Sequence, residues 1–382
     1  MNIVGIIIET NPFHNGHMYF INEIKNKYKP DLLIAITSTS FTMRGEISVI
    51  NKFDKTNALL KAGVNIVLEF PFILSTQSSD YFAANAITIL NEIGVNHIIC
   101  GCENDEVTNL ELFYELENTK IFNDTFKENL NKHKSYKQTF EDTLMQLNID
   151  NNLIKLYNKP NFTLAYQYYK VIKNKFSHIK MSLIKRTNSY DDETLDSNIV
   201  SAKAIRQARL NNLDYNSYLP FEEKLIDISE ASNKLANLIN YLCLINTDFS
   251  NTINNEGIIN YVLKNYQMNN SYEDLINGLS NKRYSKSRIR RTILYMLLNV
   301  NNFYHNAIYL RILGIDNFGL NYINTLKKET KNNIFSSVKE LKENQICYNI
   351  LEIELLATKL YSVITNNNDL LLKEYQVPIR KD

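Results

Sequence analysis

Tryptophan is absent from the 382-residue sequence, and cysteine, proline and glycine are scarce, with 4, 6 and 10 copies. Cys100 and Cys102 flank Gly101, whereas Cys243 and Cys347 stand far from any other cysteine. No CxxC pair occurs, so the sequence indicates neither a zinc site nor a disulfide framework. Free thiols are typical of a reducing compartment, and we expect a cytoplasmic protein.

Long apolar runs are also missing. The run at residues 3–8 is too short for a signal peptide or a membrane span, and no basic segment precedes it. The chain carries 42 Lys and Arg against 41 Asp and Glu, a formal charge of +1. This balance excludes a global attraction to nucleic acid, so an RNA partner would need a local basic patch. We therefore expect a soluble protein with no membrane contact and no DNA partner.

The remaining composition, 44% hydrophobic and 22% charged, is typical of a folded protein long enough for two domains. In the first half, apolar runs alternate with helical patterns. The runs lie at 3–8, 31–37, 64–70, 97–101 and 180–184, and the helical patterns include 18–28, 52–62, 80–93 and 160–173. This alternation predicts an α/β fold with a Rossmann-like parallel sheet and helices on both faces. From about residue 212 the periodicity is helical, which predicts a first domain at 1–215 and an all-helical domain at 216–382.

The most informative motif follows the first predicted strand and reads GIIIETNPFHNGHMY at residues 5–19. It places His14 and His17 at a strand-to-helix turn, where unpaired N–H groups and the helix dipole favour a phosphate. Gly16 has no Cβ, so the backbone can approach that phosphate closely. The imidazoles can donate hydrogen bonds to charge developing on phosphoryl oxygens. This HxGH signature is typical of nucleotidyl-transferring α/β enzymes, although two histidines around Asn-Gly can also form a solvated turn.

Further polar groups and one glycine lie where predicted strands end. Arg44 and Glu46, after the second strand, can contact a substrate carboxylate or a ribose, or form a surface ion pair. Lys52 and Lys55 on the next helix can complete a positive pocket, or be solvated on an exposed face. Gly101 ends the fourth strand, where a ribose or adenine can press on the backbone, though a tight turn also favours glycine.

Two later segments extend this set of candidates. Asn161 is a predicted helix N-cap, and a capping Asn can lie beside a bound nucleotide. Arg186 ends the fifth predicted strand. Ser201 then opens a helix that carries Lys203 and Arg206, which predicts a second anion site suited to β- and γ-phosphates. A Ser-capped helix with solvated cations is the structural alternative.

One dense basic segment, which we call the basic segment, lies in the helical half at residues 281–291, NKRYSKSRIRR. Such a cluster suits the phosphate backbone of RNA, with Tyr284 available to stack on a base. A solvated charged face is the alternative. The residues predicted to bind RNA are Lys282, Arg283, Tyr284, Lys286, Arg288, Arg290 and Arg291.

Together these segments resemble the bacterial tRNA(Met) cytidine acetate ligase family. The resemblance covers almost the whole chain and is carried by ETNPFHNGH at 9–17, RGE at 44–46, the stretch 63–71, GCEN at 101–104, KPN at 159–161, Arg186, residues 201–206, KRY at 282–284 and YLRILG at 309–314. The string NPFHNGH is much more specific than HxGH alone.

The resemblance implies a ligase that joins ATP and acetate into acetyl-adenylate and pyrophosphate. The acetyl group would then pass to N4 of the wobble cytidine of elongator tRNA(Met). His14 and His17 would be catalytic. ATP would be held by Gly101, Asn161 and Arg186, and by Ile7, Ile8, Glu9, Thr10, Asn11, Pro12, Phe13, His14, Asn15, Gly16, His17, Met18, Tyr19 and Phe20. Mg²⁺ is expected to help neutralise the phosphates, although no carboxylate cage is visible.

The chain also departs from the family pattern. Thr10 stands where an aromatic residue is expected, Met43 where Gln is expected, Thr39 replaces a glycine and Ile47 a proline. Lys203 stands where a hydroxyl residue is usual, which alters the phosphate site. Two other functions therefore stay open: a small-molecule adenylyltransferase of cofactor metabolism, and a diverged non-catalytic RNA-binding protein.

Overall fold

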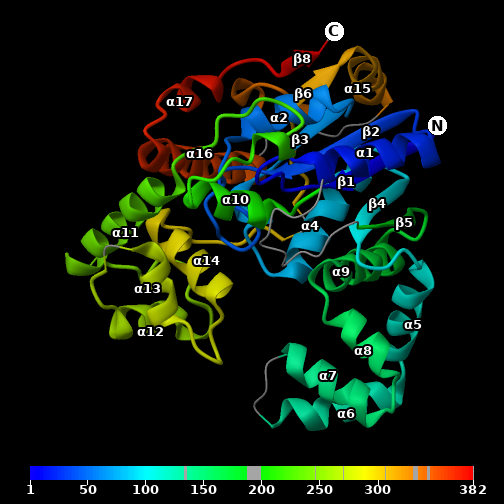
Figure 1. Ribbon diagram of the computed structural model, residues 1–382, viewed down its shortest axis with the longest axis horizontal. Coiled ribbons are helices and arrows are strands. Elements are labelled where there is room, and N and C mark those ends of the chain that lie inside the picture. Colours follow the sequence, from blue (N-terminus) through cyan, green and yellow to red (C-terminus); the bar gives the residue numbers. More distant parts are fainter. Residues whose placement is uncertain are drawn as a thin grey trace.

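A single sheet forms the centre of the computed structural model (Figure 1), with the strand order β5–β4–β1–β2–β3–β6–β7 and β8 paired to β6. The structure describes residues 1–132, 136–186, 199–245, 247–269, 271–305, 307–329, 334–341 and 345–381. The first five strands run parallel to one another and comprise β1 (Ile3–Ile7), β2 (Leu32–Ser38), β3 (Ile66–Phe70), β4 (His97–Cys102) and β5 (Lys180–Lys185). The predicted parallel α/β fold is confirmed.

Helices cover both faces of this sheet. Alternate strand residues such as Ile6 and Leu33 share one apolar cluster with helices α1 (Asn15–Tyr28) and α2 (Lys52–Lys61). The apolar cluster on the other face of the sheet contains Ile34 together with side chains of α4 (Ser79–Glu92), α9 (Pro160–Lys175) and α16 (Gln345–Thr365). The short helix α3 (Phe72–Ser75) precedes α4. Because both faces are covered, the sequences of the central strands are continuous apolar runs.

A helical extension stands away from the sheet between β4 and α9 (Figure 1). It comprises α5 (Val107–Glu117), α6 (Lys120–Leu130), α7 (Tyr136–Gln146) and α8 (Asn151–Tyr157). Within it, the sequence pattern at residues 122–156 predicts polar, surface-facing helices. The helices are confirmed, and they also enclose aromatic side chains, including Phe140 and Tyr157 with ring centroids 4.2 Å apart.

The second half of the chain begins with helices, as predicted. Helix α10 (Ala202–Leu210) packs beside the sheet, and α11 (Ile228–Leu244), α12 (Ile258–Asn265), α13 (Tyr272–Leu279) and α14 (Lys286–Leu297) form a lobe next to it. Short 3-10 turns lie at Asn216–Tyr218, Asn255–Gly257 and Val338–Leu341. None of the helices in the described ranges has the length and apolar character that a membrane span requires.

The chain then returns to the sheet and adds three strands to it. The prediction for 216–382 contains helices alone and does not include these strands. Strand β6 (Leu310–Asp316) pairs antiparallel with β3, and β7 (Ile334–Phe335) and β8 (Ile379–Lys381) pair with β6. Helices α15 (Asn317–Glu329) and α17 (Asp369–Lys373) connect these strands together with α16. The C-terminal segment is therefore part of the α/β sheet, and among the described residues of 216–382 the lobe α11–α14 is the helical part.

Buried charges hold this returning segment in place. Arg311 on β6 donates to Glu69 on β3 at 3.2 Å and to Glu374 at 2.8 Å. The Lys52 ammonium on α2 lies 2.7 Å from Glu69, 2.9 Å from Glu354 and 2.5 Å from Glu374. We call these five residues the buried ion cluster. An Arg in the middle of an apolar run obscures the strand in the sequence, because its partners lie far away along the chain.

Candidate active site

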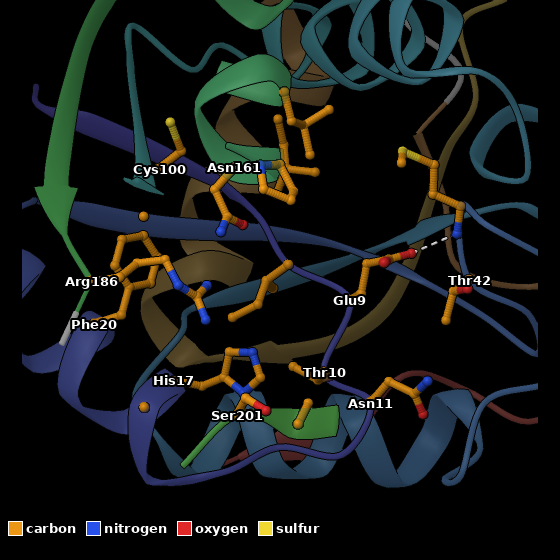
Figure 2. Close-up of a pocket in the computed structure, with 18 of the residues that line it drawn as sticks. Glu9, Thr10, Asn11, His17, Phe20, Thr42, Cys100, Asn161, Arg186 and Ser201 are labelled. Carbon is orange, nitrogen blue, oxygen red and sulfur yellow. Dashed lines mark hydrogen bonds between the residues drawn. The ribbon is translucent and has the colours of Figure 1, made fainter. Parts of the chain in front are cut away.

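A cavity of about 460 Å³ opens at the carboxyl ends of β1, β4 and β5 (Figure 2). Its walls include Ile7 of β1, Gly101 of β4 and Ile184 of β5. The chain runs from β1 through β2 to β3 on one side of β1 and then crosses to β4 on the other side. This change of direction opens a crevice between strands, the position where parallel α/β sheets bind their ligands.

His14 and His17 line this cavity at the start of α1. His14 Nδ1 accepts a hydrogen bond from the Gly16 amide at 3.0 Å, and His17 Nδ1 accepts one from the His14 amide at 3.3 Å. An imidazole that accepts at Nδ1 carries its proton on Nε2. Both rings therefore keep an Nε2–H donor for a ligand.

The surroundings keep these two rings uncharged. Burial, together with the cations Arg186 and Arg206, lowers the pKa of His14 to about 3. Burial, followed by the neighbouring His14, holds the pKa of His17 well below its usual value. The ring centroids lie only 4.0 Å apart, so a second positive charge would be strongly disfavoured. At neutral pH the site presents two neutral donors.

Gly16 has a steric role that differs from the predicted one. A Cβ at this position would lie 2.7 Å from His14 Cε1 and 2.9 Å from His14 Nδ1. The glycine therefore makes room for the imidazole that caps its own amide. The sequence predicts close approach of a phosphate instead, which no contact in the structure tests.

A second helix N-terminus borders the same cavity. Ser201 caps α10 by accepting from the Ala204 amide at 3.0 Å, as the sequence predicts. Lys203 and Arg206 from the first turns of α10 line the cavity. Arg206 donates to the Asn11 carbonyl at 2.7 Å and lies 3.6 Å from the Glu46 carboxylate. The two predicted anion-binding helix starts thus share one cavity.

The opposite wall contains Asn161 and Arg186 (Figure 2), and Gly101 also lines the cavity. Asn161 is not the N-cap of α9, because Lys159 occupies that position. The helix start is capped by Glu103, which accepts from the Asn161 amide at 3.2 Å and from its Nδ2 at 2.8 Å. Sequence reasoning missed Glu103, although a carboxylate is a good partner for a helix N-terminus and GCEN at 101–104 contains it.

Most residues predicted to bind ATP line the cavity. Pro12, Phe13, Asn15 and Met18 do not. Phe13 is fully buried and packs against His17, with ring centroids 5.4 Å apart. Wall residues missed in the sequence come largely from helices, and they include Phe82, Asn158, Thr163, Leu164 and Tyr168. The sequence does not distinguish them, because a helix residue next to a cavity has the same side-chain types and spacing as one that packs in the core.

The loop after β2 contributes Met43, Arg44 and Glu46 to the wall, which agrees with the prediction for Arg44 and Glu46. Glu9, directly after β1, accepts from the Met43 amide at 2.7 Å (Figure 2). Burial raises the pKa of the Glu9 carboxyl. Glu9 therefore fixes the loop against the first strand.

The prediction that Lys52 supports a substrate or its phosphates is wrong. Its ammonium is bound by three carboxylates in the buried ion cluster, and only 2% of its side chain is exposed. The cluster keeps the ammonium protonated and raises its pKa. Lys55 is also buried and donates to the carbonyls of Ser38 and Thr39.

The basic segment divides into an outer and an inner part. Lys282, Arg283 and Lys286 are exposed. In the inner part Arg290 pairs with Glu273 at 2.6 Å, and Arg291 donates to the Met43 carbonyl at 3.5 Å. The first contact holds α14 against α13, and the second holds it against the loop after β2.

Tyr284 and Arg288, two of the predicted RNA contacts in this segment, are held by contacts within the protein. Tyr284 is 3% exposed and its hydroxyl donates to the Glu256 carbonyl, so it presents no free ring face to a base. Arg288 lies 3.2 Å from the Glu256 carboxylate and is partly exposed. The cations that an RNA backbone can reach directly are therefore in the outer part.

The parallel sheet and the paired helix starts define the class of α/β nucleotidyl transferases with an HxGH turn. A family model described as HIGH Nucleotidyl Transferase matches residues 1–374. The tRNA(Met) cytidine acetate ligase of Thermoanaerobacter sp. (strain X514) is 30% identical over 405 residues, covering 100% of both chains. The Clostridium perfringens (strain ATCC 13124) protein of the same name is 31% identical, covering 95% of this chain and 96% of that one.

Solved structures agree with these sequence relatives. Thermotoga maritima TmcAL in its apo form superposes with a TM-score of 0.85 at 25% identity, covering 100% of this chain and 99% of the other. The same protein bound with alpha-thio ATP gives a TM-score of 0.84 at 25% identity, with 100% of both chains covered. The chain belongs to the HIGH nucleotidyl transferases and, within them, to the tRNA(Met) cytidine acetate ligase family of enzymes.

Proposed function

We propose that the protein activates acetate with ATP and transfers the acetyl group to N4 of the wobble cytidine of elongator tRNA(Met). The observation that carries this proposal is the pair of neutral histidines at the start of α1, which lies beside a second helix N-terminus in one cavity. That arrangement suits a nucleoside triphosphate. The acyl and RNA substrates follow from the names of the relatives at 30% identity or more.

In the first step an acetate oxygen attacks the α-phosphorus of ATP. A new O–P bond forms, the bond to the bridging oxygen breaks, and pyrophosphate leaves with the electron pair. The Nε2–H groups of His14 and His17 would donate to the α-phosphate oxygens as charge builds up there. Lys203 and Arg206 at the start of α10 would neutralise the departing pyrophosphate.

Mg²⁺ would enter with the phosphates of ATP and be held largely by them. Among the described residues, no group of three or more His, Cys, Asp or Glu side chains can bind an ion. The metal would add positive charge to the triphosphate, while the protein groups named above orient it.

In the second step the exocyclic amine of the cytosine attacks the acetyl carbonyl. A C–N bond forms, the C–O bond to phosphate breaks, AMP leaves, and the amine loses a proton. The target base must be unstacked, which an anticodon loop allows. Residues 1–215 would carry the ATP site and 216–382 most of the tRNA surface, through the outer part of the basic segment. A tRNA substrate is consistent with the expected cytoplasmic location.

The deciding experiment incubates the protein with ATP, labelled acetate and tRNA(Met) and then digests the RNA to nucleosides. We expect labelled N4-acetylcytidine, and we expect His14→Ala and His17→Ala each to slow acetate-dependent ATP–pyrophosphate exchange by at least about 10-fold. Exchange without N4-acetylcytidine would favour a small-molecule adenylyltransferase. ATP binding without exchange would favour a non-catalytic RNA-binding protein.

A further inference from the structure

Glu9 presents a carboxylate oxygen to the cavity. It follows β1 directly, lines the cavity and is half-buried. Its Oε1 accepts from the Met43 amide at 2.7 Å, and among the described residues the carboxyl makes no other hydrogen bond. Neither oxygen of Glu9 is an enclosed atom without a partner, so Oε2 keeps accessible surface. The side chain therefore offers a ligand one acceptor whose position is fixed by the bond at Oε1.

The surroundings of this carboxyl favour a ligand that donates hydrogen bonds. Burial raises the pKa of Glu9, and the nearby cations Lys55 and Arg44 do not reverse the shift. Glu46, a second carboxylate in the cavity wall, raises the pKa further. The site is thus unfavourable to one more negative charge, such as a phosphate or a carboxylate. An N–H group that donates to Oε2 would instead compensate the buried carboxylate.

Glu9 lies away from the predicted nucleotide wall. In Figure 2, Glu9 is on one side of the cavity, whereas Phe20, Asn161 and Arg186 are on the other, and His17 lies between them. A ligand bound at Glu9 would therefore lie across the histidine turn from the adenosine. This is the side from which a second substrate can approach a group attached to the α-phosphate.

The Glu9 side of the cavity also adjoins α14. Arg291 of this helix donates to the carbonyl of Met43, the residue whose amide holds Glu9. Arg290 of the same helix lies 3.9 Å from the Glu46 carboxylate. The outer part of the basic segment lies at the start of α14 and just before it. An RNA strand bound there would therefore reach the cavity on the Glu9 side.

We propose that Glu9 recognises the exocyclic amine of the target cytosine. This inference rests on the proposed function and assigns a position to its second substrate. Oε2 accepts one N4–H of the base, the contact by which carboxylates read cytosine. The other N4–H and the lone pair of the nitrogen stay available to the acyl group. Uracil has the acceptor O4 in place of this amine, so a carboxylate disfavours it.

Glu9→Gln tests this contact because it replaces the acceptor by a donor. The amide Oε1 can keep the bond to Met43, which turns Nε2 toward the cavity. The experiment measures the Kd of anticodon stem-loops with cytosine or uracil at the wobble position, in saturating AMP. We expect the wild type to bind the cytosine form at least about 10-fold more tightly, equivalent to about 1.4 kcal/mol. In Glu9→Gln this preference should disappear or reverse.

A change in the RNA provides a second measurement that needs no variant. A stem-loop with a pyrimidinone base at the wobble position lacks the exocyclic amine and adds no bulk. It should bind the wild type about 10-fold more weakly than the cytosine form does. Glu46→Gln is the matched control, because this carboxylate also lines the cavity but lies against Arg206 and Arg290. It should keep the preference for cytosine.

The outcomes separate this contact from the proposed function. Wild-type protein that forms no N4-acetylcytidine overturns both. Formation of N4-acetylcytidine without a wild-type preference for cytosine, or with the same preference in Glu9→Gln, overturns the role of Glu9 alone. A rise of more than about 10-fold in the Kd for ATP in Glu9→Gln also overturns it, because the carboxyl would then serve the nucleotide.

Discussion

Each histidine of the HxGH turn accepts a main-chain hydrogen bond at Nδ1, and this contact decides which proton the ring can offer. The His14 ring caps α1 by accepting from the Gly16 amide, and the His17 ring accepts from the His14 amide. The two rings therefore stabilise the turn that positions them. The same contacts leave the Nε2 protons available for a ligand. At these residues the helix cap and the proposed catalytic donors are the same groups.

A first prediction concerns the charge of these rings. Because the fold lowers the pKa of His14 to about 3, this ring should take up no proton between pH 8 and pH 5, and the His17 ring should titrate well below its usual range. The ¹⁵N shifts of the labelled imidazoles should show an Nε2-protonated neutral His14 ring throughout that range. Assignment can use the single variants His14→Gln and His17→Gln. A titration midpoint near 6.5 in either ring would contradict the prediction.

The same pKa shifts link pH to stability. A histidine with a lowered pKa in the folded state binds fewer protons there than in the unfolded chain, so its contribution to stability decreases as pH falls below about 6.5. Acid should therefore destabilise the folded protein through both rings, and His14→Gln should weaken that pH dependence.

Gly16→Ala gives a second prediction at this scale. The added methyl would lie 2.7 Å from His14 Cε1, so the ring must rotate or α1 must shift. Either change breaks the Nδ1 bond to the residue 16 amide. We expect exchange activity to fall at least about 10-fold, as for loss of a transition-state donor. Gly278→Ala is the control, since a Cβ there meets nothing within 4 Å. Equal activity in the two variants would refute the steric role.

The sequence predicts the histidine turn well because all its determinants lie within about ten residues. It does not predict the environment of Lys52. The ammonium and one of its partners, Glu354, are 302 residues apart. A lysine on a helix looks solvated until the fold brings such a carboxylate to it. Local motifs are therefore predictable, and long-range charge pairs are not.

At the scale of elements, α14 joins two parts of the molecule. Lys286 at its start is exposed, as are Lys282 and Arg283 just before the helix. Arg290 instead pairs with Glu273 and lies 3.9 Å from Glu46 in the cavity wall. Gly45 packs so closely on α14 that a Cβ would lie 3.0 Å from Arg290 Cβ. This helix thus contacts the loop that borders the cavity, and the candidate RNA surface lies at its N-terminal end.

This division determines how the RNA surface should be tested. Replacing the exposed Lys282, Arg283 and Lys286 by Ala should weaken tRNA binding and reduce the slope of log K against log salt by about 2, with exchange unchanged. Binding across a salt series measures it. Substituting Arg290 or Arg291 would instead disturb the cavity wall.

The exposed lysines Lys120, Lys127 and Lys155 of the helical extension provide a matched control triple. Their replacement by Ala should leave both tRNA affinity and its salt slope unchanged. An equal loss in both triples would mean that the tRNA lies over the extension as well, and no loss in the first triple would remove the assigned surface.

At the scale of the whole molecule, the buried ion cluster joins the N-terminal sheet to the returning C-terminal segment. It contains three carboxylates and two cations, Lys52 and Arg311. Burial, with Glu69 and Glu374 nearby, raises the pKa of Glu354 to about 7, while burial is outweighed at Glu69 by Arg311 and Lys52. With every group ionised the cluster has one carboxylate more than it has cations, and the raised pKa of Glu354 reduces this excess of negative charge.

Lys52→Met should therefore destabilise the fold. Removing the cation leaves buried carboxylates without compensation, which typically costs about 3–5 kcal/mol. The loss should be smaller at acid pH, where the carboxylates take up protons. Urea unfolding at pH 8 and pH 5 measures both effects. Lys359→Met on the exposed side of α16 is the control and should change the free energy of unfolding by less than about 0.5 kcal/mol.

The overall fold shows the same limit of sequence reasoning as the residues do. The five parallel strands and the lobe α11–α14 follow from local periodicity. Strand β6 does not, because its neighbour β3 lies far away in the sequence and Arg311 interrupts its apolar pattern. An interior Arg becomes compatible with a sheet only once Glu69 and Glu374 are in place.

The pairing of β6 with β3 has a consequence for how the protein is made. Glu69 and its partner Arg311 are separated by 242 residues, and at about 5–20 residues per second a ribosome needs about 10–50 s to synthesise that interval. Throughout this time β3 has an open edge, and its Glu69 has Lys52 but not yet Arg311 as a partner. A charged side chain on an open edge discourages pairing with other nascent chains until the closing strand emerges.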